Sequence, residues 1–342
     1  MKRAVLLALL ALLLPRPGTG VGYPQKPLAS LESKPFGVLL LGEGGDKVWK
    51  DSTDAIIRDL SKKFPIEFVV GQADIKLIQK SVESLRAAHV QKLVVIPLCR
   101  SSQSPLMEQI RFIFGLRKDP SPDFFAASRT GAGYALVRRV QAKLPVVVTA
   151  AIDESAVVSE ILTSRALSLS RHPEEEAVVL VGIAPAFRED EGKPLGPTKK
   201  NPTPVDEYAQ SLAALAERVR AQGSFKTAAS AVLSDSPLQS QRERTDADLR
   251  RLVRQMSLER RVLVVPHALT GVVPSLRILR ALQGVFMRYN HQGLLPDARI
   301  ERWIEETARQ GAATPDMRVY KDAGKPLHTA PAFPRVRVQE AY

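Results

Sequence analysis

The sequence predicts an α/β protein with two doubly wound parallel-sheet lobes related by internal duplication. Three observations carry this prediction. Short apolar runs alternate with segments of helical periodicity, the alternation restarts near residue 177, and RVLVVP at 261–266 echoes KLVVIP at 92–97. Alternating strands and helices produce right-handed crossovers and a parallel sheet. The 342 residues are enough for two such domains, and 44% hydrophobic residues can fill their cores.

Continuous apolar runs mark the strands of the first half, because strands of a parallel sheet are buried on both faces. These runs are residues 36–41, 66–70, 92–98 and 144–152. Apolar residues at helical spacing predict helices around residues 49–64, 75–89, 106–114 and 157–162. His89 falls on the apolar side of the second of these helices, so we expect it in the core.

The second half repeats this order. Strands are predicted at residues 177–181, 228–233 and 261–266. Helices are predicted at residues 208–219, 249–256, 274–284 and 296–309. A loop at 188–204 and a longer charged helix after Leu238 account for the greater length of this half. We interpret the pattern as a duplication of one α/β unit.

The remaining segments lie outside the two repeats. Residues 1–20 are predicted to be a secretory signal peptide, because they contain in order the basic Lys2 and Arg3, the apolar residues 4–14 and the small residues 18–20. A linker is predicted at 21–35. The lobes are predicted at 36–172 and 177–310, and a Pro-rich basic tail at 311–342. We therefore expect export to the periplasm or the extracellular space; the alternative is an uncleaved N-terminal anchor. No apolar run is as long as a conventional spanning helix requires.

Composition and charge exclude several classes of function. The single cysteine, Cys99, excludes an internal disulfide and any multi-cysteine metal site, and its place after a strand predicts a buried thiol. The loop 42–45 lacks the glycine and lysine patterns of nucleotide sites. The net charge is +13, and the arginines after residue 241 alternate with acids. Because no aromatic residues lie between these arginines, the pattern argues against nucleic-acid binding. It leaves three interpretations of the basic charge: a solvated helix face, a site for an anionic ligand, or a surface for an anionic membrane.

Five short motifs together resemble a known family. They are LLLGEG at 39–44, VVIPL at 94–98 with SSQS at 101–104, AAIDE at 150–154, AVVLVG at 177–182 and GLLP at 293–296. In this order they are similar to the class II tetrapyrrole chelatases, and most of all to sirohydrochlorin cobaltochelatases of the internally duplicated kind. The resemblance spans residues 36–310.

The resemblance implies a lyase that inserts a divalent metal, cobalt above all, into an anionic tetrapyrrole such as sirohydrochlorin. In the family, histidines bind the metal and accept the pyrrole protons. Here Glu43 stands in place of the first histidine, none is found near Ser104 for the second, and Glu154 stands in place of the third. Carboxylates are weaker bases than imidazole but competent ligands of divalent ions. We therefore expect a metal- or tetrapyrrole-binding protein whose chelatase activity is degenerate.

The candidate site residues lie in loops after the predicted strands, where parallel α/β sheets bind their ligands. Glu43 and His267 are the candidate catalytic groups. Alternatively, Glu43 caps the following helix, and His267 is a structural residue at a strand end whose hydrogen bonds are satisfied within the fold. The candidate ligand-binding residues are Gly42, Gly44, Ser101, Ser102, Ser104 and Asp153. The candidate metal ligands are Glu43, Glu108 and Glu154.

Two other functions fit the same features. A periplasmic solute-binding protein also has two α/β lobes behind a signal peptide. It requires several hinge connections, whereas the sequence indicates one link between the lobes, at 170–176. An interaction protein with a vestigial cleft would act through the basic tail instead. Ligand-dependent melting separates this last function from the others.

Overall fold

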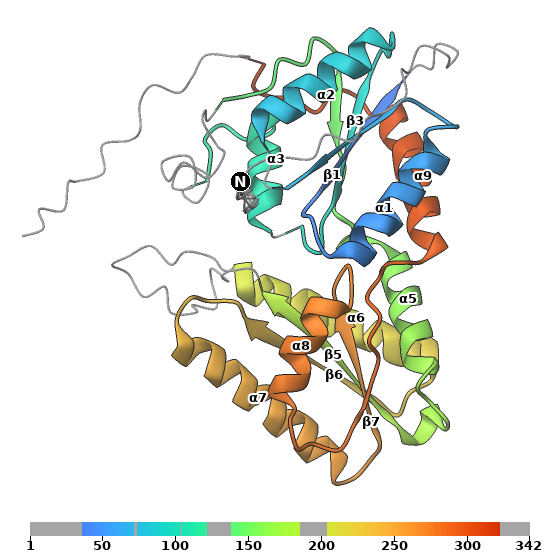
Figure 1. Ribbon diagram of the computed structural model, residues 1–342, viewed down its shortest axis with the longest axis vertical. Coiled ribbons are helices and arrows are strands. Elements are labelled where there is room, and N and C mark those ends of the chain that lie inside the picture. The colour runs from blue at the N-terminus through green and yellow to red at the C-terminus, as the bar shows by residue number, and fades with distance from the viewer. Residues whose placement is uncertain (1–35, 72–73, 103, 122–137, 185–203, 322–342) are drawn as a thin grey trace, which may run out of the picture.

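The first lobe is built around a four-stranded parallel sheet (Figure 1). The computed structural model describes residues 36–71, 74–102, 104–121, 138–184 and 204–321. The strands are β1 (Gly37–Gly42), β2 (Ile66–Val70), β3 (Leu93–Leu98) and β4 (Val146–Val148), in the order β2-β1-β3-β4. The first helices of the chain are α1 (Lys47–Leu60), α2 (Ile75–Ala87) and α3 (Pro105–Ile113).

The second lobe repeats the topology of the first. Its parallel strands are β5 (Ala177–Ala184), β6 (Thr227–Ser234), β7 (Val262–His267) and β8 (Arg288–Tyr289), in the order β6-β5-β7-β8. Its helices include α6 (Pro204–Gly223), α7 (Gln239–Ser257) and α8 (Val272–Ala281). The register repeats as well, since Gly42 pairs with Leu98 in the first sheet and Gly182 with His267 in the second. The predicted fold class is confirmed.

The last helix of each half covers the sheet of the other half. Helix α5 (Ala156–Leu167) follows β4 and packs against α6 and β7 of the second lobe. Helix α9 (Ala298–Ala313) follows β8 and packs against β3 and β4 of the first lobe. The chain therefore crosses between the lobes twice. The predicted lobe ranges placed each of these helices in the lobe of its own half, whereas the structure exchanges them.

The segment predicted as the link between lobes lies inside the second lobe. The short turn η3 (Pro173–Glu175) leads into β5, and Pro173 O accepts a bond from Lys226 N at 2.9 Å. Glu176 is buried and accepts from Ser170 Oγ and from Arg261. The true connections are 149–155 and 290–297. The argument from a single link against a solute-binding protein is therefore wrong.

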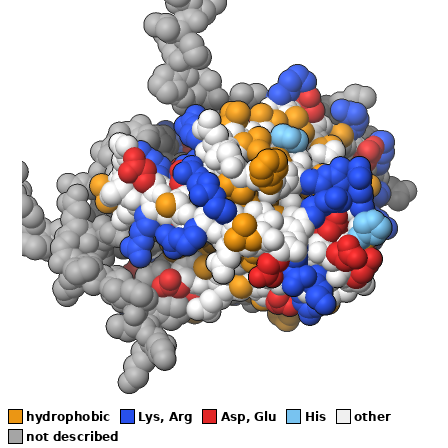
Figure 2. Space-filling model, turned by 90° about the horizontal axis from the view of Figure 1, so that it is seen from below, with side chains coloured by type: hydrophobic (Ala, Val, Ile, Leu, Met, Phe, Trp, Pro, Cys, Tyr) orange, Lys and Arg blue, Asp and Glu red, His pale blue; other side chains and the backbone are white. Residues whose placement is uncertain are grey.

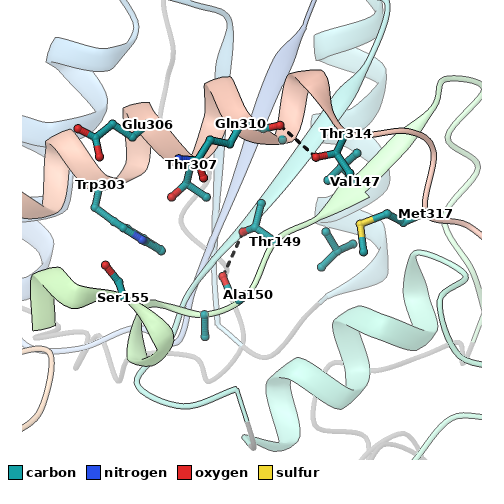
Figure 3. Close-up of a pocket in the computed structure, with 13 residues that line it drawn as sticks. Val147, Thr149, Ala150, Ser155, Trp303, Glu306, Thr307, Gln310, Thr314 and Met317 are labelled. Carbon is teal, nitrogen blue, oxygen red and sulfur yellow. Dashed lines mark hydrogen bonds between the residues drawn. The ribbon is translucent and has the colours of Figure 1, made fainter. Parts of the chain in front are cut away.

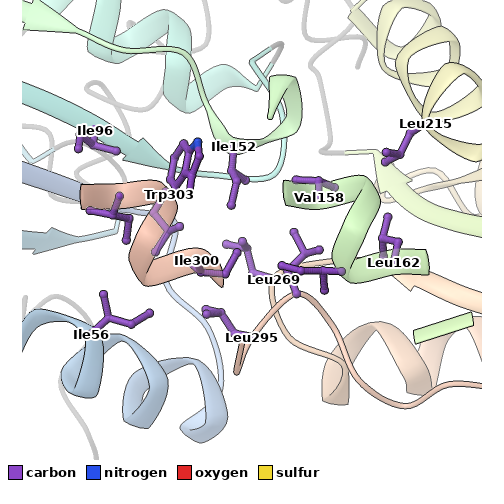
Figure 4. Close-up of a cluster of buried hydrophobic side chains, with 14 of the residues drawn as sticks. Ile56, Ile96, Ile152, Val158, Leu162, Leu215, Leu269, Leu295, Ile300 and Trp303 are labelled. Carbon is purple, nitrogen blue, oxygen red and sulfur yellow. The ribbon is translucent and has the colours of Figure 1, made fainter. Parts of the chain in front are cut away.

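One hydrophobic core runs through both lobes (Figure 4). Alternate residues of β1, β3, β5 and β7 face this core, and α1, α5, α6 and α9 enclose it. Helices α2 and α3 cover the opposite face of the first sheet, and α7 and α8 cover that of the second. Ile152, Leu295 and Ile300 lie where the exchanged segments meet (Figure 4). The exchange thus joins the two lobes through a shared apolar interior.

Local signals explain most element boundaries. Side-chain caps begin α1, α2, α3, α5 and α9; the capping residues are Asp46, Asp74, Ser104, Ser155 and Asp297. The strand predicted at 144–152 is shorter, because the chain turns into η2 (Ile152–Glu154) soon after β4. The expectation for His89 is wrong. This residue follows α2 with a φ of 58° and is exposed.

The start of the predicted tail belongs to the first lobe. Helix α9 continues to Ala313, and the residues after it bond to the first lobe. Met317 N donates to Val146 O in β4, and Tyr320 N donates to Gly115 O after α3, each at 2.9 Å. The predicted signal peptide, the linker and residues 322–342 lie outside the described residues. In the described ranges, none of the helices has the length and apolar character needed to cross a bilayer.

Candidate functional site

The carboxyl ends of the two sheets face each other across the junction between the lobes. Arg100, just after β3, donates from Nη1 to the carbonyl of Ile183 in β5 at 3.4 Å. Thr270, after β7, donates to Oδ2 of Asp46, after β1, at 3.1 Å. Helices α1, α3 and α8 begin after these strand ends, so their N-terminal dipoles favour negative charge at this junction. Parallel α/β sheets hold their ligands in this position.

Glu43 is paired with an arginine. Its Oε2 accepts from Arg100 Nε at 3.2 Å, and the two side chains remain 22% and 24% exposed. The interpretation of Glu43 as the cap of α1 is wrong, because Asp46 takes that place by accepting from Trp49 N at 2.9 Å. Gly44 has a φ of 91°, which glycine adopts without strain. The loop therefore presents a carboxylate–guanidinium pair.

The loop after β3 is fastened to the η2 turn through Asp153. Ser102 donates to the two carboxylate oxygens of Asp153, from its backbone N at 2.7 Å and from its Oγ at 2.8 Å. Ser102 Oγ in turn accepts from Ala151 N at 3.3 Å. These bonds position Arg100, which lies two residues before Ser102. Asp153 thus orders the loop that carries the arginine.

Ser101 and Ser104 are buried beside Cys99. Ser104 Oγ caps α3 by accepting from Met107 N at 3.3 Å, and the Cys99 thiol donates to Ser101 O at 3.6 Å. Burial, followed by the nearby charge of Glu43, raises the pKa of the Cys99 thiol. The expectation of a buried thiol is confirmed. The two serines hold the backbone of this loop.

Tyr208 and His267 form a buried pair on the second-lobe side of the junction. Tyr208 Oη lies 2.9 Å from His267 Nδ1, and His267 is 3% exposed. Burial, together with the charge of Arg100, lowers the pKa of His267 to about 4. Burial also raises the pKa of Tyr208. At neutral pH the pair is therefore an uncharged imidazole bonded to a phenol, and within the described structure His267 Nε2 is buried without a hydrogen-bond partner.

The duplication places an aromatic residue against the same glycine in each lobe. A Cβ atom at Gly42 would lie 2.7 Å from Trp49 Cζ2. At Gly182, the matching position, it would lie 2.3 Å from Tyr208 Oη. Both glycines therefore permit a close approach of the first helix to the first strand. In the second lobe this approach brings Tyr208 to His267.

The predicted metal ligands are not brought together. Glu108 pairs with Arg111 at 2.6 Å and with Arg117, while Glu43 pairs with Arg100. The side chain of Glu154 lies outside the described part of the structure. Among the residues that the structure describes, no three His, Cys, Asp or Glu side chains form a group able to hold a metal ion.

Sequence reasoning missed two residues of this site, Arg100 and Tyr208. Arg100 is the only charged residue between Lys92 and Glu108, and it directly follows the strand end, so the signal was present. Tyr208 matches the helical spacing of core residues. Its role depends on the partner that β7 supplies, which the spacing does not reveal.

A hollow lies between α9 on one side and β4 with the segment after it on the other (Figure 3). Its volume is ≈ 450 Å³, and the Trp303 ring points into it together with Ser155 and Thr307 (Figure 3). Its lining includes Glu306 and no lysine, arginine or histidine. A polyanion would meet a carboxylate and no cation there. The lobe junction, with Arg100 and several helix N-termini, suits an anion better.

Comparison with known proteins supports the fold. Neither a protein-family model nor a curated protein matches the sequence. SirB from Bacillus subtilis with Fe3+ aligns with a TM-score of 0.54 and 13% identity, over 82% of this chain and 96% of that chain. SirB from Bacillus subtilis subspecies spizizenii, a sirohydrochlorin chelatase in complex with cobalt, aligns with a TM-score of 0.48 and 12% identity, over 82% and 96%.

A multi-domain protein from Deinococcus radiodurans with structural similarity to chelatases also aligns, with a TM-score of 0.48 and 12% identity, over 83% of this chain and 57% of that chain. The alignment with the Fe3+ structure of SirB shows that this chain has the class II chelatase fold. At this identity the likeness concerns the fold alone.

Proposed function

We propose that the protein binds an anionic tetrapyrrole of the sirohydrochlorin class at the lobe junction and has lost efficient metal insertion. The observation that carries this proposal is the placement of Arg100 where the carboxyl ends of both sheets meet. The chelatase fold supports the ligand class. The paired state of Glu43 and the burial of His267 support the loss of metal insertion.

Arg100 can contact a ligand carboxylate without leaving its present partners. Its Nε bonds to Glu43 and its Nη1 to Ile183 O, while Nη2 has no hydrogen-bond partner among the described residues. About a quarter of the side chain is exposed. A charge-assisted bond between guanidinium and carboxylate is roughly twice as strong as a neutral hydrogen bond. A tetrapyrrole rich in carboxylates therefore fits this position.

Metal insertion requires a group that accepts the pyrrole protons, and both candidates are poorly suited. Protonation of Glu43 would weaken its ion pair with Arg100. With a pKa of about 4 and a hydrogen bond to Tyr208, His267 is a weak and inaccessible base at neutral pH. If a divalent ion such as cobalt enters as a substrate, Glu43 is the carboxylate that bonds to Arg100, and Asp153 is bonded to Ser102 in the loop that carries Arg100.

An absorbance titration with sirohydrochlorin tests ligand binding. The native protein should shift the visible spectrum, and Arg100→Gln should raise the Kd by about 10- to 100-fold, the range for one hydrogen bond to a charged group. Arg58→Gln removes an exposed arginine from the last turn of α1 and serves as the control. Absence of a shift in the native protein would overturn the proposal. Equal Kd values for the two variants would show that Arg100 does not contribute to ligand binding.

We also propose that the chain is exported, on the strength of the order of charges and apolar residues in 1–20. N-terminal sequencing of the protein recovered from the periplasm of an expressing bacterium tests this. The expected first residue lies near residue 21. Recovery of the full chain from the cytosol would contradict export.

A further inference from the structure

The outer side of the second lobe exposes large apolar side chains. Phe286, in the turn after α8, is 92% exposed, and Leu258, directly after α7, is 82% exposed. Exposure of a single apolar residue is ordinary in a water-soluble protein. Two large apolar side chains that are almost fully exposed, each just after one of two neighbouring helices, require a physical explanation.

The two side chains lie at the same edge of the lobe. Helices α7 and α8 follow parallel strands, so both run back from the carboxyl edge of the sheet to its amino edge. Arg250, two turns before the end of α7, donates from Nε to the carbonyl of Ala281, the last residue of α8, at 2.8 Å, so the two helices are in contact. Figure 2 looks onto this end of the molecule and shows hydrophobic side chains between groups of lysine and arginine.

Basic residues outnumber acidic ones around these side chains, although Glu259 directly follows Leu258 and pairs with Arg260. Residues 249–258 and 271–296 contain six arginines and no aspartate or glutamate; the arginines are Arg250, Arg251, Arg254, Arg277, Arg280 and Arg288. Arg277 is neutralised by Asp246 and Arg251 faces Asp248. Arg254 and Arg280 are exposed and have no ion-pair partner among the described residues.

A shallow groove follows this side of α7. Its volume is ≈ 470 Å³, and it is lined by Ala247, Arg250, Arg251, Arg254, Gln255 and Leu258. Three guanidinium groups thus surround a space that ends at an exposed leucine. Guanidinium forks match the geometry of phosphate oxygens, and the leucine at the end of the groove can enter an apolar phase.

We propose that this surface, made of Arg250, Arg254, Leu258, Arg280 and Phe286, docks the protein on a bilayer of anionic phospholipid. The arginines would contact headgroup phosphates, while Leu258 and Phe286 would enter the boundary between headgroups and acyl chains. Charge complementarity selects this partner, because a soluble anion would leave the two apolar side chains in water. The proposal does not depend on the ligand at the lobe junction.

Vesicle sedimentation with the full chain tests the proposal. Vesicles of phosphatidylcholine alone are compared with vesicles that also contain phosphatidylglycerol. We expect the native chain to bind the anionic vesicles and to be released by salt. Arg250→Gln with Arg254→Gln should lower the partition coefficient by about 30-fold, since each arginine near an anionic surface contributes about a factor of five. Leu258→Ser with Phe286→Ser should lower it by roughly 10-fold.

Two controls keep the result specific. Val319→Ser changes an exposed apolar residue of the first lobe, and Arg58→Gln changes an exposed arginine of α1; neither should alter partitioning. All variants carry the same apolar residues 4–14, so differences between them report on the docking surface. Equal partitioning of the native chain and both double variants would overturn the proposal. Loss of self-association in the Leu258→Ser, Phe286→Ser chain without any vesicle binding would assign the surface to a second copy instead.

Discussion

The burial of His267 should make the stability of the protein fall in mildly acidic solution. The folded structure lowers the pKa of this imidazole to about 4, first through burial and second through the charge of Arg100. In the unfolded chain the pKa returns to its ordinary value of 6.5. Between these two values the unfolded chain binds the proton and the folded chain does not, so acid favours unfolding.

The size of the effect follows from the two pKa values. The stabilisation is complete above pH 6.5 and declines as the pH falls towards 4, with a total loss of about 3 kcal/mol. This is a large share of the 5–15 kcal/mol by which proteins are typically stable. Because the imidazole is 3% exposed, solvent screening reduces the effect little.

Urea unfolding at several pH values between 7 and 4 measures this loss. The reference is His267→Asn, whose side chain can still accept a bond from Tyr208 but does not titrate. The two chains differ only at residue 267, so the difference between the two pH profiles reports on His267. We expect the native chain to lose about 3 kcal/mol more than the variant over this interval.

Parallel pH profiles for the two chains would refute the reasoning. They would mean that His267 is solvated or has an acidic partner in the folded state. An NMR titration of the His267 ring gives an independent reading, with no more than about a tenth of the full titration shift expected between pH 7 and pH 5. Arg100→Gln should raise the pKa of His267, because it removes the nearby positive charge.

Three further predictions concern the packing that shapes the site. Gly182→Ala should destabilise the fold by about 1–3 kcal/mol in urea unfolding, because its Cβ would lie 2.3 Å from Tyr208 Oη; a Tyr208→Phe background should reduce that cost, and an equal cost in both backgrounds would contradict the contact. Ile304→Ala in α9 should lower the free energy of unfolding by about 2–5 kcal/mol and increase hydrogen exchange at amides of the first sheet, whereas Leu162→Ala in α5 should increase exchange in the second sheet. The reverse pattern would contradict the exchange of the two helices between the lobes. Gly115→Ala should speed tryptic cleavage at Arg318 and Lys321, because its Cβ would lie 2.2 Å from Tyr320 O and the φ of 75° suits glycine; an unchanged cleavage rate would show that this segment is held elsewhere.

The strands and their repeated order could be predicted because burial on both faces leaves a continuous apolar run. β2 matches its predicted range of 66–70, and β1, β3 and β7 differ from theirs by one residue at each affected end. The exchange of α5 and α9 could not be predicted in the same way. Apolar residues of α5 are spread around the helix rather than along one stripe, so their spacing does not say which sheet lies against it. The answer depends on the path of residues 149–155, and helical periodicity does not reveal such a path.

The positions of the candidate residues in the fold were predictable, but the partners of their side chains were not. Glu43, Ser102 and Asp153 follow strand ends and His267 ends β7, where the rule for parallel sheets places ligand-binding residues. The side chains that bond to these residues come from elsewhere in the chain, and these bonds determine the charge and reactivity of each residue. Glu108 illustrates this. A carboxylate in the first turn of a helix can bind a metal ion, interact with the helix dipole or pair with a nearby arginine, and here Glu108 pairs with Arg111 and Arg117.

The rate of cobalt incorporation into sirohydrochlorin tests the central claim most directly. The measurement follows the visible spectrum of the tetrapyrrole after addition of Co²⁺, with the protein and without it. We predict that the protein shifts the spectrum of the free tetrapyrrole in a manner that depends on Arg100, while metal enters no faster than in the protein-free control. Faster conversion that is abolished by Glu43→Ala would contradict the account and establish a chelatase.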